Sequence, residues 1–290
     1  MNEPPKKAST VILLRDPVEV LLMQRSTHDS FMAKATVYPG GAVDDSDSDT
    51  GLADFSGGFD DAIARKILNN PDPDMNASSG LFFAAIRELF EEAFILIAQK
   101  VSGEPLDFSK EPDLSRFRKY RKAIHAKEMT LVELAEIEGI VYKPEALVPF
   151  AHWITPVFQK TRFDTWFFLA RLPHGQVAVH DNEELTSAAW LTPCDALEKN
   201  MAGEIMLLPP TMITLNELLS FNSVSELLSN ASTKDIPVII PEGFVEGSTA
   251  GVRLPNDPDY SNAELKLPSM QGKPSRVILD NGTWRMISAD

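Results

Sequence analysis

Residues 87–92 read Arg-Glu-Leu-Phe-Glu-Glu, and this stretch decides the fold expected for the chain. It lies within segment 79–97, where apolar residues recur every three or four positions and therefore share one face of an α-helix. The apolar face comprises Phe82, Ile86, Phe90, Ala93 and Ile97. Glu88, Glu91 and Glu92 gather on the opposite side. The pattern predicts a helix that is anchored in the core by one face and presents carboxylates on the other.

The glutamates on this helix need positive charge near them. Like charges on one helix face cost roughly 0.2–0.5 kcal/mol per pair unless they are neutralised. Arg87 lies four residues before Glu91, so its guanidinium can orient that carboxylate. A cluster of carboxylates also suits Mg²⁺ or Mn²⁺, which prefer oxygen ligands. Taken alone, however, the pattern is more typical of an acidic helix face in solvent, so the surrounding sequence must decide.

Short strands precede the helix and follow it. Segments 9–14 and 18–23 are rich in β-branched and aliphatic residues and are separated by a brief polar break, which predicts a β-hairpin. Another strand is expected at 36–38, ended by the Pro-Gly-Gly turn at 39–41. A β-rich stretch spans 140–191. The remaining predicted helices cover 60–68, 114–127, 131–138, 194–200, 211–220 and 223–230.

Composition limits the possible partners. The chain has 27 basic and 42 acidic residues among 290, which gives a formal net charge of −15. This charge argues against nucleic acid and against an anionic membrane surface as partners. A small-molecule partner is expected instead, and an anionic one would need a cation or a few placed basic side chains. The one cysteine, Cys194, excludes an intramolecular disulfide and a Cys-based zinc cluster.

The Pro-Gly-Gly turn and the carboxylate helix together resemble the Nudix box, whose pattern is G-x5-E-x7-R-E-U-x-E-E-x-G-U, where U is a bulky aliphatic residue. The second half of the pattern falls on Arg87, Glu88, Leu89, Glu91, Glu92 and Ile95. The resemblance extends over roughly residues 8–220. Flanking motifs, among them Trp-Ile-Thr-Pro at 153–156 and Leu-Pro-Pro at 208–210, resemble the coenzyme A diphosphatase subgroup of that family.

This resemblance implies a fold and a chemistry. The fold is the α/β/α sandwich of the Nudix family with a mixed sheet, here with helical insertions and a C-terminal arm. The chemistry is hydrolysis, dependent on Mg²⁺ or Mn²⁺, of a diphosphate linked to another moiety. The catalytic candidates are Arg87, Glu88, Glu91 and Glu92. The metal-ligand candidates are Gly41, Glu88, Glu91, Glu92 and Glu184. The substrate-binding candidates are Arg25 and Tyr38.

Alternatives stand beside several of these candidates. Glu184 precedes a Trp-Leu pair where Nudix enzymes often carry an acidic residue that helps the metal site, yet it could simply be exposed. Arg25 could bind phosphate through its forked guanidinium, or be an ordinary surface residue. His152, in an apolar strand, is expected to be a core histidine and not a general base. Of the aromatic residues that could stack an adenine, at least two are expected to pack in the core; these are Phe163, Trp166 and Phe168.

The box departs from its pattern in three places. Gly41 lies 46 positions before Arg87, so segment 44–79 is an insertion within the box. The isolated Glu of the pattern is replaced by Ser79. Phe94 occupies the position of the late Gly, which suggests that the helix continues for another turn.

The insertion opens with alternating aspartates, which raises the possibility of a calcium-binding loop. An EF-hand loop that starts at Asp45 would need Gly and Glu where Thr50 and Ser56 stand. A solvated acidic insertion is therefore favoured. Asp44 is a candidate for a partial substitute for the isolated Glu of the box.

The chain is divided into a Nudix domain at 1–231 and a C-terminal arm at 232–290. The domain carries the 44–79 insertion and a helical insertion at 110–139, whose basic cluster at 116–122 is expected to face solvent. The arm loses periodicity and has too little apolar surface to fold alone. Its end, 276–287, predicts a hairpin around Asp-Asn-Gly. We expect the arm to dock onto the domain or onto a partner subunit, as in a homodimer.

The function expected from the sequence is hydrolysis of coenzyme A or acyl-coenzyme A at its diphosphate. Other diphosphate substrates, such as dinucleotides or nucleotide sugars, are the alternative within this class. A catalytically weak Nudix-fold module that only binds a nucleotide-like ligand is the alternative outside it. No peroxisomal Ser-Lys-Leu-type signal is present at 287–290, and a cytoplasmic location is expected.

Overall fold

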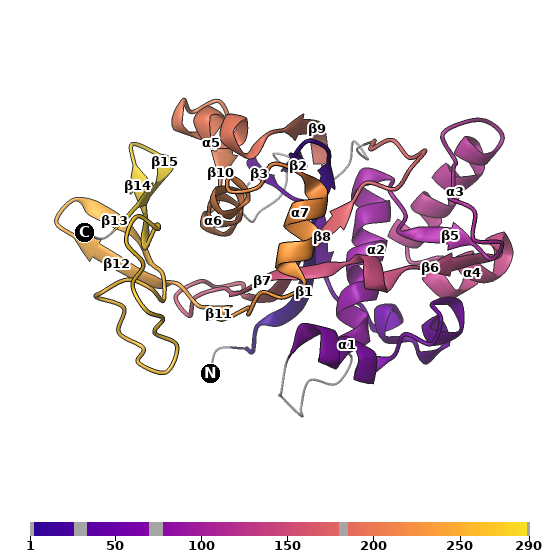
Figure 1. Cartoon of the computed structure of the whole chain (residues 1–290), viewed down its shortest axis with the longest axis horizontal. Coiled ribbons are helices and arrows are strands. Elements are labelled where there is room, and N and C mark those ends of the chain that lie inside the picture. The colour runs from indigo at the N-terminus through magenta and orange to yellow at the C-terminus, as the bar shows by residue number, and fades with distance from the viewer. Residues whose placement is uncertain (1–2, 26–33, 70–77, 180–184, 289–290) are drawn as a thin grey trace.

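The computed structural model describes residues 3–25, 34–69, 78–179 and 185–288 (Figure 1). A nine-stranded mixed sheet forms its centre. The strands are β1 (Lys6–Arg15), β2 (Glu19–Arg25), β3 (Ala35–Val37), β4 (Gly40–Ala42), β7 (Val148–Ile154), β8 (Phe163–Arg171), β9 (Leu185–Leu191), β10 (Met206–Leu207) and β11 (Val238–Ile239). Their order is β10-β3-β2-β1-β8-β7-β11, with β4 also paired to β1 and β9 to β2.

Strand β1 runs through the middle of this sheet. It pairs with β2 in the antiparallel sense, which confirms the predicted hairpin, and with β8 in the parallel sense. Its alternate side chains enter two separate cores: Val11 and Leu13 on one face, Ile12 and Leu14 on the other. All four side chains are fully buried, as expected of a strand covered on both faces.

Helices cover both faces of the sheet. Their bounds are α1 (Asp61–Leu68), α2 (Ser78–Ala93), α3 (Asp113–His125), α4 (Leu131–Glu138), α5 (Pro193–Met201), α6 (Pro209–Leu218) and α7 (Val224–Ala231). Helix α2 packs on one face, and α5, α6 and α7 pack on the other. The structure confirms the expected mixed α/β fold with helices on both sides.

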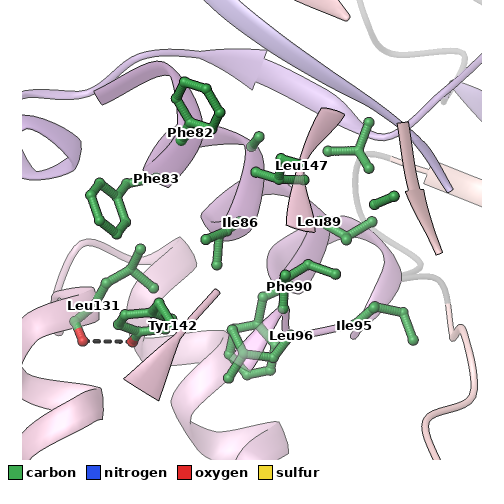
Figure 2. Close-up of a cluster of buried hydrophobic side chains, with 14 of the residues drawn as sticks. Phe82, Phe83, Ile86, Leu89, Phe90, Ile95, Leu96, Leu131, Tyr142 and Leu147 are labelled. Carbon is green, nitrogen blue, oxygen red and sulfur yellow. Dashed lines mark hydrogen bonds between the residues drawn. The ribbon is translucent and has the colours of Figure 1, made fainter. Parts of the chain in front are cut away.

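The apolar stripe of α2 anchors that helix as predicted. Figure 2 shows Phe82, Ile86 and Phe90 directed into a cluster that also receives Leu131 and Tyr142. The Tyr142 hydroxyl donates a 2.6 Å hydrogen bond to the Leu131 carbonyl oxygen, so the one polar atom that this ring brings into the core has a partner. The two residues come from α4 and from β6 (Ile140–Tyr142), which pairs with β5 (Ala98–Lys100).

The end of α2 differs from the expectation. The helix stops at Ala93, and Phe94, at the position of the late Gly in the box, adopts the left-handed conformation with φ of 58°. Its N–H donates to the Phe90 carbonyl at 3.1 Å, which closes the last turn. The Phe94 ring is buried, with its centroid 5.7 Å from that of Phe90 and 4.9 Å from that of Phe108. Aromatic packing thus offsets a backbone strain that glycine would avoid.

We therefore expect Phe94→Gly to destabilise the protein even though it restores the box pattern. Relief of backbone strain gains about 1–2 kcal/mol, whereas loss of a buried phenyl ring costs about 3–5 kcal/mol. The free energy of unfolding, measured by urea titration, should fall by about 2–3 kcal/mol. Phe94→Ala keeps the strain and loses the ring, so it should be the less stable of the two. A glycine variant as stable as the parent would contradict this account.

The C-terminal strands form a second sheet at one end of the molecule, opposite to α3 and α4 (Figure 1). Its strands are β12 (Glu242–Glu246), β13 (Thr249–Arg253), β14 (Arg276–Asp280) and β15 (Thr283–Ile287). The last two confirm the predicted hairpin. The first two lie in a stretch for which no strand was predicted, because each strand buries at most one side chain and so lacks an alternating apolar pattern.

This sheet packs against the domain within the same chain. Val252 and Val277 are buried in the core cluster that contains α5, α6 and α7. The Asn200 side-chain amide, at the end of α5, donates to the Trp284 carbonyl at 2.9 Å. Both oxygens of Asp257, in the segment between β13 and β14, accept hydrogen bonds from Arg276 at 2.7 and 3.0 Å. Among the residues that the structure describes, no helix has the length and apolar character needed to cross a membrane.

Candidate active site

Arg87 lies at the centre of the hydrogen-bond network of the site. Its guanidinium makes two hydrogen bonds to Asp47, at 2.8 and 2.9 Å, and donates to Glu88 at 2.8 Å and to Glu91 at 2.9 Å. It also donates to the Ala42 carbonyl at 2.9 Å. The predicted pairing of Arg87 with Glu91 is confirmed, but Glu91 is one of four partners: three carboxylates and one backbone carbonyl. One buried cation therefore orients two box carboxylates and fixes the loop before the helix.

Asp47 corrects the interpretation of segment 44–79 as a solvated acidic insertion. Its side chain is 1% exposed, and burial raises the pKa of its carboxyl in spite of the Arg87 guanidinium. It belongs to the first of two short 3₁₀ helices, Asp45–Ser48 and Thr50–Phe55. The insertion therefore supplies the main partner of the box arginine.

The helical insertion also reaches the site, through α3. Arg121 donates to the carbonyl oxygens of Glu91 at 2.6 Å and of Glu92 at 2.9 Å. His125 lies one turn further along, with Nδ1 3.1 Å from the Glu91 carboxylate. A positive charge near the last carbonyls of a helix is favourable. The expectation that the basic residues of α3 face solvent is wrong for Arg121, because α3 crosses the end of α2.

Glu88 and Glu92 lie against the Gly40–Gly41 turn. The Gly40 N–H donates to the Glu92 carboxylate at 2.7 Å. A Cβ atom at Gly41 would lie 2.4 Å from Glu88 Oε1, so that no residue with a side chain fits at this position while Glu88 keeps its place. Burial raises the pKa of the Glu88 carboxyl to about 7 in spite of Arg87. The turn and the helix thus bring the carboxylates of Glu88 and Glu92 to one place.

The donor set fits a divalent cation of the Mg²⁺ or Mn²⁺ type. Carboxylates and backbone carbonyls are hard oxygen donors, and a cation beside Glu88 would favour the ionised form that burial disfavours. Within the described ranges, no group of three His, Cys, Asp or Glu side chains is arranged so that it could hold a metal ion. The carboxylate of Glu91 contacts Arg87 and His125 in this arrangement. Glu184 lies outside the described residues.

A cavity of about 690 Å³ opens beside the turn. Gly40 forms part of the cavity wall, and its N–H donates to Glu92. The Glu92 carboxylate and the cavity therefore both adjoin Gly40. Arg25 and Tyr38, predicted to bind substrate, both line it. The Tyr38 hydroxyl lies 3.2 Å from Thr214 Oγ1, and burial raises its pKa. Tyr38 is thus a neutral, buried part of the wall at neutral pH.

The other candidates are divided between core and cavity. His152 is buried, stacks on Trp166 with ring centroids 4.3 Å apart, and lies 2.5 Å from an Asp164 oxygen, as expected for a core histidine. Trp166 and Phe168 are buried in the core beneath α2, whereas Phe163 lines the cavity. The expectation that at least two of the three aromatics pack in the core is confirmed.

Three residues of the site were not among the sequence candidates: Asp47, Arg121 and His125. The four-residue spacing of Arg121 and His125 places both on one face of α3, and this signal was present in the sequence. Asp47 is one of several aspartates in a row, and nothing local distinguishes it.

Comparison with known proteins agrees with this geometry. A family model described as the NUDT19 Nudix domain matches residues 5–218. Relatives named acyl-coenzyme A diphosphatase NUDT19 are 29% identical in Xenopus laevis, over 84% of this chain and 73% of theirs, and 28% identical in Gallus gallus, over 91% and 80%. A crystal structure of a Nudix hydrolase from Alicyclobacillus acidocaldarius is 26% identical, with a TM-score of 0.61 over 81% of this chain and 100% of that one.

The fold, the helix with its Arg-Glu-x-x-Glu-Glu core, and a family model that covers about three quarters of the sequence all agree. This chain belongs to the Nudix hydrolase family and matches its NUDT19 Nudix domain.

Proposed function

We propose that this chain hydrolyses the diphosphate of coenzyme A or of acyl-coenzyme A in the presence of Mg²⁺ or Mn²⁺. The observation that carries the proposal is the junction at Gly40, where a carboxylate pair beside the box arginine adjoins a large apolar cavity. Such a junction suits a substrate that has a charged diphosphate and a long, less polar extension. The names of the Xenopus and Gallus relatives support the same substrate class.

In this proposal the cation is held by oxygen donors from the box: Gly41, Glu88, Glu91 and Glu92, with Glu184 as a further ligand. When bound, such a cation neutralises diphosphate charge and lowers the pKa of a coordinated water. Arg87 and His125 keep Glu91 in place, and the Gly40 N–H does the same for Glu92. Arg25, in the cavity wall, binds a phosphate oxygen through its forked guanidinium.

The proposed reaction is attack of water on one phosphorus of the diphosphate. The bond from that phosphorus to the bridging oxygen breaks, and a box carboxylate accepts the proton of the water. Coenzyme A then yields 3′,5′-ADP and 4′-phosphopantetheine. A module that only binds ligand has no need of clustered, buried carboxylates, which favours the enzyme over that alternative. The proposed compartment is the cytoplasm, in line with the single, exposed cysteine, Cys194.

A substrate panel tests the proposal. Coenzyme A, an acyl-coenzyme A, a nucleotide sugar and a dinucleotide are incubated with the protein and Mg²⁺ or Mn²⁺, and products are separated by chromatography. We expect kcat/KM for the coenzyme A compounds to exceed the others by about tenfold or more, the discrimination that a fitted pocket provides. If coenzyme A compounds were inert while a nucleotide sugar or dinucleotide turned over, the alternative substrate class would replace this proposal.

A further inference from the structure

The cavity beside the active site has walls from two parts of the chain. One wall comes from the central sheet and α6, with Trp153, Phe163 and Phe167 among its residues. The other comes from the C-terminal sheet, which contributes residues of β12, β13 and β14 together with Trp284 of β15. The C-terminal sheet lies outside residues 5–218, the part of the chain that matches the family model. A segment beyond the matched domain therefore completes a cavity of the active site.

The two walls of the cavity differ in polarity, because hydrogen-bonding side chains such as Gln159, Thr165 and Thr211 lie outside the wall that belongs to the C-terminal sheet. Among its described lining residues, Arg25 is the only one with a formal charge. The part that belongs to the C-terminal sheet consists of glycine, alanine, valine, leucine and aromatic side chains. A phosphorylated nucleotide needs several charged or hydrogen-bonding partners, whereas an alkyl chain needs only apolar surface. A volume of about 690 Å³ lies within the range of pockets that hold a drug-sized ligand.

The C-terminal sheet is fitted closely to this wall. A Cβ atom at Gly243 of β12 would lie 2.7 Å from Cε1 of Phe158, so the absence of a side chain lets the Phe158 ring rest on the strand. The next residue, Phe244, also lines the cavity. The guanidinium carbon of Arg253, on β13, lies 4.8 Å from the centroid of the Phe244 ring. These contacts pack β12 against Phe158, in the loop between β7 and β8, and place a guanidinium over the Phe244 ring.

From these observations we infer that the C-terminal sheet forms the binding surface for the acyl chain of an acyl-coenzyme A substrate. The inference rests on the proposed function and deepens it. With the diphosphate at the Gly40–Gly41 turn, the acyl end extends along the cavity toward Phe244 and Trp284. The sheet thereby sets a preference for acyl-coenzyme A over free coenzyme A, and contributes no group to the chemistry.

Chain-length profiles test this inference. We would measure kcat/KM for free, acetyl-, hexanoyl- and decanoyl-coenzyme A, and binding of the same compounds by calorimetry in chelator. Each buried methylene favours binding by up to about fourfold, so decanoyl- should exceed acetyl-coenzyme A by at least about tenfold. Ala250→Trp fills the cavity from β13, and Val245→Glu places a charge in its wall. Both residues are exposed in the described structure, which favours folding of the variants.

Both variants should lose the chain-length preference while kcat/KM for free coenzyme A stays within about twofold. Ile287→Trp and Met270→Glu, matched changes at exposed residues that do not line the cavity, should keep the preference. A flat chain-length profile in the wild type, with free coenzyme A still hydrolysed, would overturn the inference alone. An equal loss for all four compounds in both folded variants would also overturn it, because the cavity would then hold a part common to them. Failure to hydrolyse or bind any of the four would instead reject the proposed function.

Discussion

Glu92→Gln and Glu88→Gln are each expected to lower turnover by a factor of about 10³ or more. A cation-dependent transition state that loses a ligand carboxylate loses several kcal/mol of charge compensation, and about 4 kcal/mol corresponds to a thousandfold. The fold should survive, since glutamine preserves the volume of glutamate and its carbonyl oxygen can still accept from the Gly40 N–H at position 92. Turnover is measured against Mg²⁺ concentration, with thermal melts in chelator as the test of folding.

Glu136→Gln is the matched control for this experiment, because Glu136 is an exposed glutamate on α4 and lies outside the site. It should leave both turnover and melting temperature unchanged. Glu91→Gln is a less clean probe, since Glu91 also engages Arg87 and His125. Near-normal activity in both Glu88→Gln and Glu92→Gln would remove the proposed mechanism from consideration.

Arg87→Gln is expected to lower the free energy of unfolding by about 3–5 kcal/mol, the usual cost of leaving a buried charge without its partner. The stranded charge is Asp47, which is 1% exposed and receives two hydrogen bonds from Arg87. Adding Asp47→Asn to Arg87→Gln removes that charge. The double variant should therefore be more stable than Arg87→Gln alone, although each single change destabilises the wild type.

The effect should also depend on pH. Burial already raises the pKa of Asp47 in the folded protein, and loss of the Arg87 guanidinium raises it further. Because the folded pKa lies above the unfolded one, the penalty is present at neutral pH and shrinks as falling pH protonates Asp47. Urea titrations of the four proteins at two pH values give the coupling energy. Strictly additive losses, with no pH dependence, would show that Asp47 and Arg87 do not form the pair described here.

The sequence predicted the parts of this protein whose order is local. The α2 stripe of Phe82, Ile86 and Phe90 has a 3.6-residue period over several turns, and every one of these side chains is buried. The hairpin of β1 and β2 follows from two apolar runs and a short break. The α4 helix, whose bounds Leu131–Glu138 match the prediction, begins at a capping box and ends at a left-handed Gly139.

The parts that could not be predicted depend on contacts between distant segments. Asp47 meets Arg87 across 40 positions of the sequence, and only the folded path of the chain selects it from its neighbouring aspartates. Phe94 ends α2 in a conformation that its residue type disfavours, and packing with Phe108 overrides that preference. Strands β12 and β13 are held by pairing and by docking onto the domain, not by an apolar pattern of their own.

The order of strands in the central sheet has a consequence for how the protein folds. Strand β1 precedes the other described strands in the sequence, yet it is central and pairs with β8, where Lys6 lies opposite Phe163, 157 positions later (163 − 6). Closing so long a loop is entropically costly, and such pairings slow folding. The β1–β2 hairpin can form early, but the edge of β1 that pairs with β8 stays unpaired until β8 docks. During that time the unpaired edge can pair with strands of other chains. We expect refolding yield to fall with protein concentration for this reason.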